Sequence, residues 1–146
     1  MPKFGRHSLE VRDTLHPDLQ LIVDEVIEVF DIRLIEGHRG QERQDALFNA
    51  DPPRTKVKFP NSKHNPLPSI AVDVMPYHPT PPHIDWNHSP SIHLLAGFML
   101  ATARQLFEAG KISHLLRWGG DWDRDYNIKE PRRFIDSPHY ELFEPT

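Results

Sequence analysis

One aspartate in an otherwise apolar segment restricts how this chain can fold. Residues 70–75 read Ile-Ala-Val-Asp-Val-Met, and prolines stand on both sides of them. A short apolar run between such breakers favours a buried β-strand. A carboxylate in that setting needs a basic partner or a metal ion, because an unpaired buried charge is very costly. Asp73 therefore predicts a polar site beside a buried strand.

The composition limits the class of protein and the kind of site. The chain has 146 residues, a formal net charge of -4 and scattered basic residues. This charge pattern gives no electrostatic footprint for nucleic acid, so we expect no nucleic-acid partner. There is no cysteine, so a metal site must use His, Asp or Glu. The length fits one domain with a proper core.

The sequence contains no segment typical of a membrane protein. The first residues lack the apolar core of a signal peptide, and no stretch approaches the roughly 18 apolar residues of a membrane span. We therefore expect a protein kept in the cytoplasm, without membrane insertion, and a monomer.

Hydrophobic periodicity and breakers predict the order of the elements. Helices are expected over residues 17–30, 41–48 and 91–109, and strands over 32–36, 70–75, 114–118 and 140–143. Residues 77–90 and 121–137 are expected to be loops. This order predicts an α+β fold in which helices pack against a small, mainly antiparallel sheet.

Three short motifs carry residues suited to chemistry. The first pairs His64, in a proline-stiffened loop, with Asp73 in the strand, and the second places Asp136 three residues before His139. The third puts Arg39 on a glycine turn after the first strand. Taken alone, each motif is weak: an Asp-x-x-His is typical of a turn, His64 of a surface loop and Arg39 of a surface ion pair. Asp73 is the exception, because its apolar setting already demands a partner.

Together the three motifs fit a hydrolytic site. Two histidines and one carboxylate are a familiar ligand set for catalytic zinc, with a fourth position left for water. A second carboxylate, Asp136, could take the proton from that water, and Arg39 could stabilise the oxyanion that forms on a carbonyl.

The same motifs, in the same order, resemble a known family. EGHRGQERQ, SKHNPLPSIAVDVMP and DSPHYEL look like the three signatures of the zinc peptidases that cut bacterial cell-wall peptides. That family holds D-Ala-D-Ala carboxypeptidases and phage L-alanyl-D-glutamate endopeptidases. The resemblance is strongest to phage endolysins, and it extends to HSLEVRDTLHPDLQLIVDEVI and RWGGDWDRD. It implies the fold shared by Hedgehog proteins and DD-peptidases.

The resemblance also implies roles for single residues. His64, Asp73 and His139 would bind one zinc ion, Asp136 would be the general base, and Arg39 would hold the scissile carbonyl or a substrate carboxylate. Ser62 would be a hydrogen-bond partner that helps to orient the metal ligands, and it would belong to the substrate-binding residues. Trp118 and Trp122 would form the floor of the substrate cleft, with aromatic core packing as an equal alternative.

The implied function is that of a phage endolysin that cleaves the L-Ala-D-Glu bond of the peptidoglycan stem peptide. Residues 1–146 would form a single catalytic domain, without a separate cell-wall-binding domain, that waits in the host cytoplasm until it is released to the wall. Three alternatives stay open: a D-Ala-D-Ala carboxypeptidase, a non-catalytic wall-binding module, and a structural metal site. The three histidines of residues 77–90 are expected to face water, in a loop that walls the substrate groove.

Overall fold

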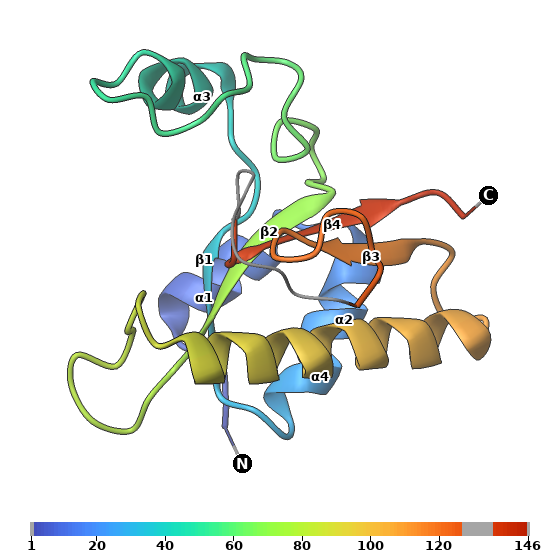
Figure 1. The fold of residues 1–146 in the computed structure, drawn as a ribbon. Coiled ribbons are helices and arrows are strands. Elements are labelled where there is room, and N and C mark those ends of the chain that lie inside the picture. The colour runs from blue at the N-terminus through green and yellow to red at the C-terminus, as the bar shows by residue number, and fades with distance from the viewer. Residues whose placement is uncertain (1, 127–135, 146) are drawn as a thin grey trace.

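A four-stranded sheet lies at the centre of the protein, with helices on its flanks (Figure 1). This computed structural model describes residues 2–126 and 136–145. The elements follow the order α1 (Arg6–Arg12), α2 (Pro17–Ile27), β1 (Ile32–Glu36), α3 (Gln41–Phe48), β2 (Ala71–Pro76), α4 (Ser89–Glu108), β3 (Leu115–Trp118) and β4 (His139–Phe143). Within the described residues, no helix is both long and apolar enough to span a membrane.

The sheet is antiparallel throughout, with the strand order β1-β2-β4-β3. Asp73 on β2 pairs with His139 on β4, and Glu141 on β4 pairs with Arg117 on β3. Directly paired residues point to the same face of a sheet. The register therefore gathers these four polar residues on one face, and the α+β prediction is confirmed.

The opposite face of the sheet is the core. It contributes the buried side chains Leu34, Val72, Val74, Leu116, Tyr140 and Leu142. They pack with apolar residues of α2 and α4, while α1 covers β1. Because side chains alternate along a strand, the residues between them face away from this core. One face of the sheet is thus left for a site.

The sequence explains where the two longest helices begin. His16 accepts a hydrogen bond from the backbone N–H of Asp18, and Pro17 occupies the first turn of α2, where its missing N–H costs nothing. At the start of α4, the His88 side chain likewise accepts a hydrogen bond from the backbone N–H of Ser91, and Pro90 lies in the first turn. The two helices contact each other, and α4 also contacts β2 and β3.

The structure corrects the predicted elements in a few places. Helix α1 was not predicted, because its seven residues are too few for a clear apolar period. Helix α2 ends at Ile27 rather than at residue 30, and α4 begins two residues earlier than expected. The loop predicted over 121–137 is described only at its two ends, since residues 127–135 lie outside the described chain.

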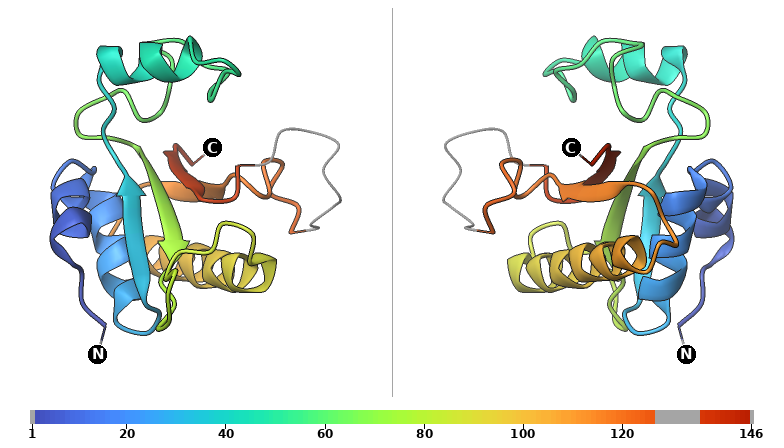
Figure 2. Two further views of the ribbon diagram at one scale, coloured as in Figure 1. Left: turned by 90° about the vertical axis from the view of Figure 1, so that its left-hand side faces the viewer. Right: turned by 90° about the vertical axis from the view of Figure 1, so that its right-hand side faces the viewer.

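Helix α3 and the segment that follows it stand apart from the other helices. Figure 1 and both side views of Figure 2 place them beyond one end of the sheet, away from α1, α2 and α4. The polar face of the sheet forms one side of a cleft, and α3 with the segment that follows it forms the other.

Candidate metal centre and active site

A cleft of about 590 Å³ contains most of the residues singled out in the sequence. Its lining comes from β1, α3, the segment 54–64, β2 and β4. The volume lies within the range of small-molecule and peptide sites, roughly 300–1,000 Å³. It is lined by Arg39, Ser62, His64, Asp73, Trp122, Asp136 and His139.

His64, Asp73 and His139 form a group that could hold a metal ion. His64 Nε2 lies 3.2 Å from His139 Nδ1, and Asp73 Oδ1 lies 3.4 Å from each of these nitrogens. A tetrahedral ion with ligand bonds of about 2.0–2.1 Å separates its ligand atoms by about 3.3–3.4 Å. The three atoms are therefore spaced as ligands of one ion.

The Asp73 carboxylate gives a second indication. Its Oδ1 is buried and has no hydrogen-bond partner among the described residues. Such an atom is costly unless a cation compensates it. The donor set and the unsatisfied oxygen both fit a bound metal ion.

Local structure explains how His64 is held in a loop. Its backbone N–H donates to Ser62 Oγ at 3.2 Å, and its ring Nδ1 lies 2.8 Å from the carbonyl oxygen of Gly37. A carbonyl can only accept, so Nδ1 carries the proton and Nε2 keeps its lone pair. That lone pair is directed at His139 and Asp73.

The short distances within this group shift the pKa values of Asp73 and His139. Burial alone would raise the pKa of Asp73, but the neighbouring His139 and His64 lower it well below its usual range. Burial would lower the pKa of His139, yet Asp73 and Glu141 raise it to about 9. The charge of each of these residues thus depends on the others.

Asp136 lies beside this group but outside it. Its Oδ2 is 3.9 Å from His139 Nδ1, and its side chain faces the cleft with about a third of its surface exposed. Burial and the negative charge of Asp73 raise the pKa of Asp136. A carboxyl group with a raised pKa is suited to proton transfer near neutral pH.

Arg39 is buried at the other side of the group. Its guanidinium pairs with Glu36 at 2.7 Å and donates to Gln44, and Nη2 lies 4.0 Å from Asp73 Oδ2. These contacts hold a fixed positive charge next to the proposed ligands. Arg39 also lines the cleft.

The remaining sequence candidates have three different placements. Ser62 is at the cleft and hydrogen-bonds to the backbone of the His64 loop. Trp122 lines the cleft, with its ring centroid 5.5 Å from that of His139. Trp118 does not form the cleft floor: it is only 3% exposed, belongs to the core, and donates its indole N–H to Ser137 O. Its register position directs it to the opposite face of the sheet.

Sequence reasoning missed three residues that shape the site. Gly37 supplies the carbonyl oxygen that orients His64, and Glu141 lies 2.8 Å from His139. A Cβ atom at Gly119 would collide with the carbonyl of Asp136, so the chain needs glycine there. For Glu141 a signal existed, since it follows His139 at the two-residue spacing of one strand face.

Two of the three histidines in loop 77–90 are less exposed than expected, whereas His88 is exposed, as expected. The ring of His83 stacks on Tyr77 at 4.9 Å, and the rings of His78 and His88 meet edge to face at 5.3 Å. His78 and His83 are half-buried and line a small hollow of their own, while Trp86 of the same loop reaches the main cleft. The loop walls the cleft through Trp86.

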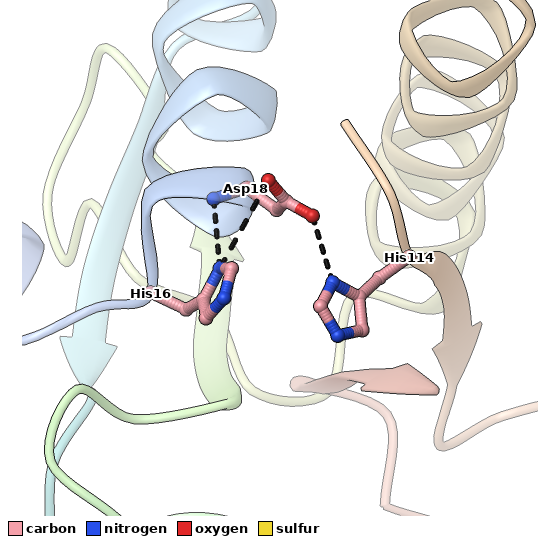
Figure 3. A group of neighbouring side chains, drawn as sticks. All are labelled: His16, Asp18 and His114. Atoms are coloured by element: carbon pink, nitrogen blue, oxygen red, sulfur yellow. Dashed lines mark hydrogen bonds and ion pairs between the residues drawn. The ribbon is translucent and has the colours of Figure 1, made fainter. Parts of the chain in front are cut away.

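A second His–Asp–His group lies elsewhere in the molecule (Figure 3). His114 Nδ1 lies 2.8 Å from Asp18 Oδ2, whereas His16 Nδ1 accepts from the backbone N–H of Asp18 and lies 4.0 Å from its Oδ1. These unequal spacings are those of hydrogen bonds, not of ligands around one ion. The group ties the start of α2 to the residue before β3, and we name it the Asp18 clasp.

Comparisons with known proteins identify the family of the chain. A search of curated proteins found no match. Among solved structures, the fold is similar to that of the Serratia marcescens L-Ala D-Glu endopeptidase ChiX, with a TM-score of 0.68 and 24% sequence identity over 97% of this chain and 90% of that one. The family model described as phage L-alanyl-D-glutamate peptidase matches residues 1–143. The chain therefore belongs to the phage L-alanyl-D-glutamate peptidase family.

Proposed function

We propose that this peptidase is a zinc-dependent endolysin that hydrolyses the L-Ala-D-Glu amide bond of the peptidoglycan stem peptide. The observation that carries the proposal is the spacing of His64, Asp73 and His139 around an unsatisfied carboxylate oxygen, at the base of a cleft in a member of this family. Two histidines and one carboxylate with an open position are typical of catalytic zinc.

In this proposal, different residues bind the metal ion and transfer the proton. When bound by His64, Asp73 and His139, zinc supplies Lewis acidity that acidifies water and polarises a carbonyl. Asp136 accepts the proton that the attacking water loses as its oxygen bonds to the carbonyl carbon. The same proton then passes from Asp136 to the amide nitrogen and the C–N bond breaks. The products are an amine and a carboxylic acid, which loses its proton to solvent.

Arg39 has the complementary task. The guanidinium is fixed by Glu36 and Gln44 before any substrate arrives, so little reorganisation is needed when negative charge develops on the carbonyl oxygen. Its position between the ligand group and α3 also allows it to bind a substrate carboxylate.

The charge of the cleft rim supports an acidic peptide as substrate. Arg43, Arg54, Lys56 and Lys63 line the side formed by α3 and the segment 54–64. The acidic residues of the cleft are Glu36, Asp73 and Glu141 on the strands, and Asp136 in the turn before β4. A stem peptide carries free carboxylates, which such a rim attracts.

Analysis of the products from purified peptidoglycan tests this function. The protein is incubated with the wall polymer, with and without a chelator, and the released fragments are identified by mass spectrometry. Fragments with a new N-terminal D-Glu, abolished by the chelator and restored by zinc, are the expected result. Release of terminal D-Ala alone would instead show a D-Ala-D-Ala carboxypeptidase, and no release under any metal condition would show a non-catalytic wall-binding module.

A further inference from the structure

A buried carboxylate lies directly behind one of the proposed ligands. Glu141 is only 6% exposed and follows His139 by two residues on β4, so both side chains lie on the polar face of the sheet. Its Oε1 is 2.8 Å from His139 Nε2, the ring nitrogen that does not face His64 and Asp73. Glu141 thus contacts His139 at the ring nitrogen that does not face the other two proposed ligands, and it also lines the cleft.

This contact decides which nitrogen of His139 carries a proton. An ionised carboxylate can only accept, so in a neutral ring the proton is on Nε2 and Nδ1 keeps its lone pair. Nδ1 is the atom that lies 3.2 Å from His64 Nε2 and 3.4 Å from Asp73 Oδ1. Glu141 therefore selects the tautomer that a metal ion requires.

The two histidines are oriented by different kinds of acceptor. His64 uses the neutral carbonyl of Gly37, whereas His139 uses a full negative charge. A carboxylate acceptor makes the imidazole a more basic ligand than a carbonyl does. The acceptor of His139 therefore contributes to metal affinity as well as to orientation.

Arg117 holds the carboxylate in place. It is the cross-strand partner of Glu141 on β3, and its Nη2 lies 3.2 Å from Glu141 Oε2. The guanidinium also packs over the ring of Phe143, with 5.5 Å between its carbon and the ring centroid. Each oxygen of Glu141 therefore has a partner of its own.

We propose that Glu141, held by Arg117, is a positioning residue that fixes the tautomer and ring orientation of His139 and thereby strengthens metal binding. This inference rests on the metal centre of the proposed function. It assigns a role to two residues outside the ligand set and outside the catalytic pair Asp136 and Arg39.

Zinc affinity of purified variants tests the proposal without using activity. The dissociation constant is measured by competition with a chromophoric chelator, and folding of each metal-free variant is checked by thermal unfolding. Glu141→Ala should weaken zinc binding by about 10–100-fold. Glu141→Gln, which keeps an acceptor without the charge, should recover part of this loss, and Arg117→Met should cause a smaller loss than Glu141→Ala.

Glu144 offers a matched control. It also pairs with a histidine, His114, at 3.2 Å, but His114 belongs to the Asp18 clasp and not to the ligand group, and the side chain of Glu144 is largely exposed. Glu144→Gln should therefore leave the zinc dissociation constant unchanged. A loss equal to that of Glu141→Gln would overturn the proposal, because it would show a general effect of surface charge.

The tautomer can be measured in the unmutated protein. Nitrogen NMR of the zinc-loaded chain should show His139 protonated at Nε2, and protonation at Nδ1 would overturn the proposal even if the variants fail to fold. If Glu141→Ala folds and binds zinc as tightly as the wild type does, this inference is overturned while the proposed function stands. No zinc binding by the wild-type chain would overturn the proposed function together with this inference.

Discussion

At the residue scale, Asp136 and His139 are separated by three positions and placed for different tasks. His139 directs a ring nitrogen at Asp73 and His64, whereas Asp136 stays 3.9 Å from that nitrogen and is partly open to the cleft. The difference arises because the turn at residues 136–138 leads into β4, so only His139 belongs to the strand. One short motif thus supplies both a proposed ligand and the proposed base.

Removing the charge of Asp136 should separate chemistry from metal binding. Asp136→Asn keeps the size of the side chain but cannot accept the proton of water, so kcat/KM should fall by about 10²–10⁴-fold. Zinc content, measured by atomic spectroscopy, should stay at the wild-type level. Asp45→Asn on the exposed side of α3 is the control, and full activity of Asp136→Asn would show that another group is the base.

Truncation of His139 should have the opposite pattern. His139→Ala removes a ligand atom, so both bound zinc and hydrolysis should be lost, with at least a hundredfold weaker metal binding. Equilibrium dialysis against zinc measures the first effect and release of wall peptides the second. Retention of stoichiometric zinc by this variant would exclude His139 from the ligand set.

At the scale of elements, the turn between β3 and the start of β4 depends on close backbone packing. Gly119 exchanges backbone hydrogen bonds with Asp136 and His139, and a Cβ at this position would collide with the Asp136 carbonyl. Trp118, the preceding residue, ties the same turn to the core through Ser137. Asp136 and His139, the proposed base and ligand, are therefore placed by a glycine and a tryptophan that do not line the ligand group.

Adding one methyl group at this turn should disturb the site. Gly119→Ala should displace Asp136, lower activity at least tenfold and destabilise the fold by about 1–3 kcal/mol, as overpacking generally does. Gly97→Ala is a matched control, because Gly97 lies inside α4 with open space around it, and alanine there should stabilise the helix by about 0.5–1 kcal/mol. Chemical unfolding measures both, and an active, stable Gly119→Ala would contradict the assigned packing.

The Asp18 clasp links two elements through a charge, so its contribution should depend on pH. Burial would raise the pKa of Asp18, but hydrogen bonds from His114 and from the backbone of Ser113 lower it below its ordinary 3.8. A depressed folded-state pKa gives stability that is present above the unfolded pKa and is lost as pH falls through the folded value. The clasp should therefore stabilise the protein above about pH 4.

Asp18→Asn tests this pH dependence. At pH 7 the variant should unfold with about 1–2 kcal/mol less free energy than wild type, because it loses the charge-assisted hydrogen bonds. The difference should shrink toward zero as the pH is lowered below 4, when the wild-type carboxylate is itself protonated. Urea titrations at fixed metal concentration between pH 3 and 7 measure it, and a gap that does not change with pH would refute the mechanism.

At the scale of the whole molecule, the proposed metal ion connects three separate parts of the chain. His64 comes from the loop after α3, Asp73 from β2 and His139 from β4. The same ion would compensate the unsatisfied oxygen of Asp73. The metal is therefore expected to stabilise the fold as well as to support catalysis.

Removal of the metal should lower the stability of the whole domain. A ligand present at a thousand times its dissociation constant adds about 4 kcal/mol to the free energy of unfolding. Chelation should thus lower Tm by several degrees, and excess zinc should restore it. His139→Ala, measured in the same way, should show no zinc-dependent rise in Tm, while an equal rise would place the stabilising ion elsewhere.

Much of this architecture could be predicted from local patterns. The strands at residues 32–36 and 70–75 and the helix at 41–48 were predicted within one residue of their ends, because apolar runs and glycine or proline breakers mark them directly. Helix α1 was missed because it is short and its stability comes from packing on β1. The choice between core and cleft for Trp118 depends on the sheet face, which the sequence left open.

By itself, the sequence determined the α+β order and the candidate ligands, because a carboxylate in an apolar strand demands compensation and the three motifs offer two histidines and a second acid. Only the tertiary structure decided which atoms meet. The β2–β4 register pairs Asp73 with His139, the β3–β4 register places Arg117 beside Glu141, and the same alternation turns Trp118 into the core. Contacts between residues distant in sequence follow from strand register, and register is set by the packing of the whole sheet.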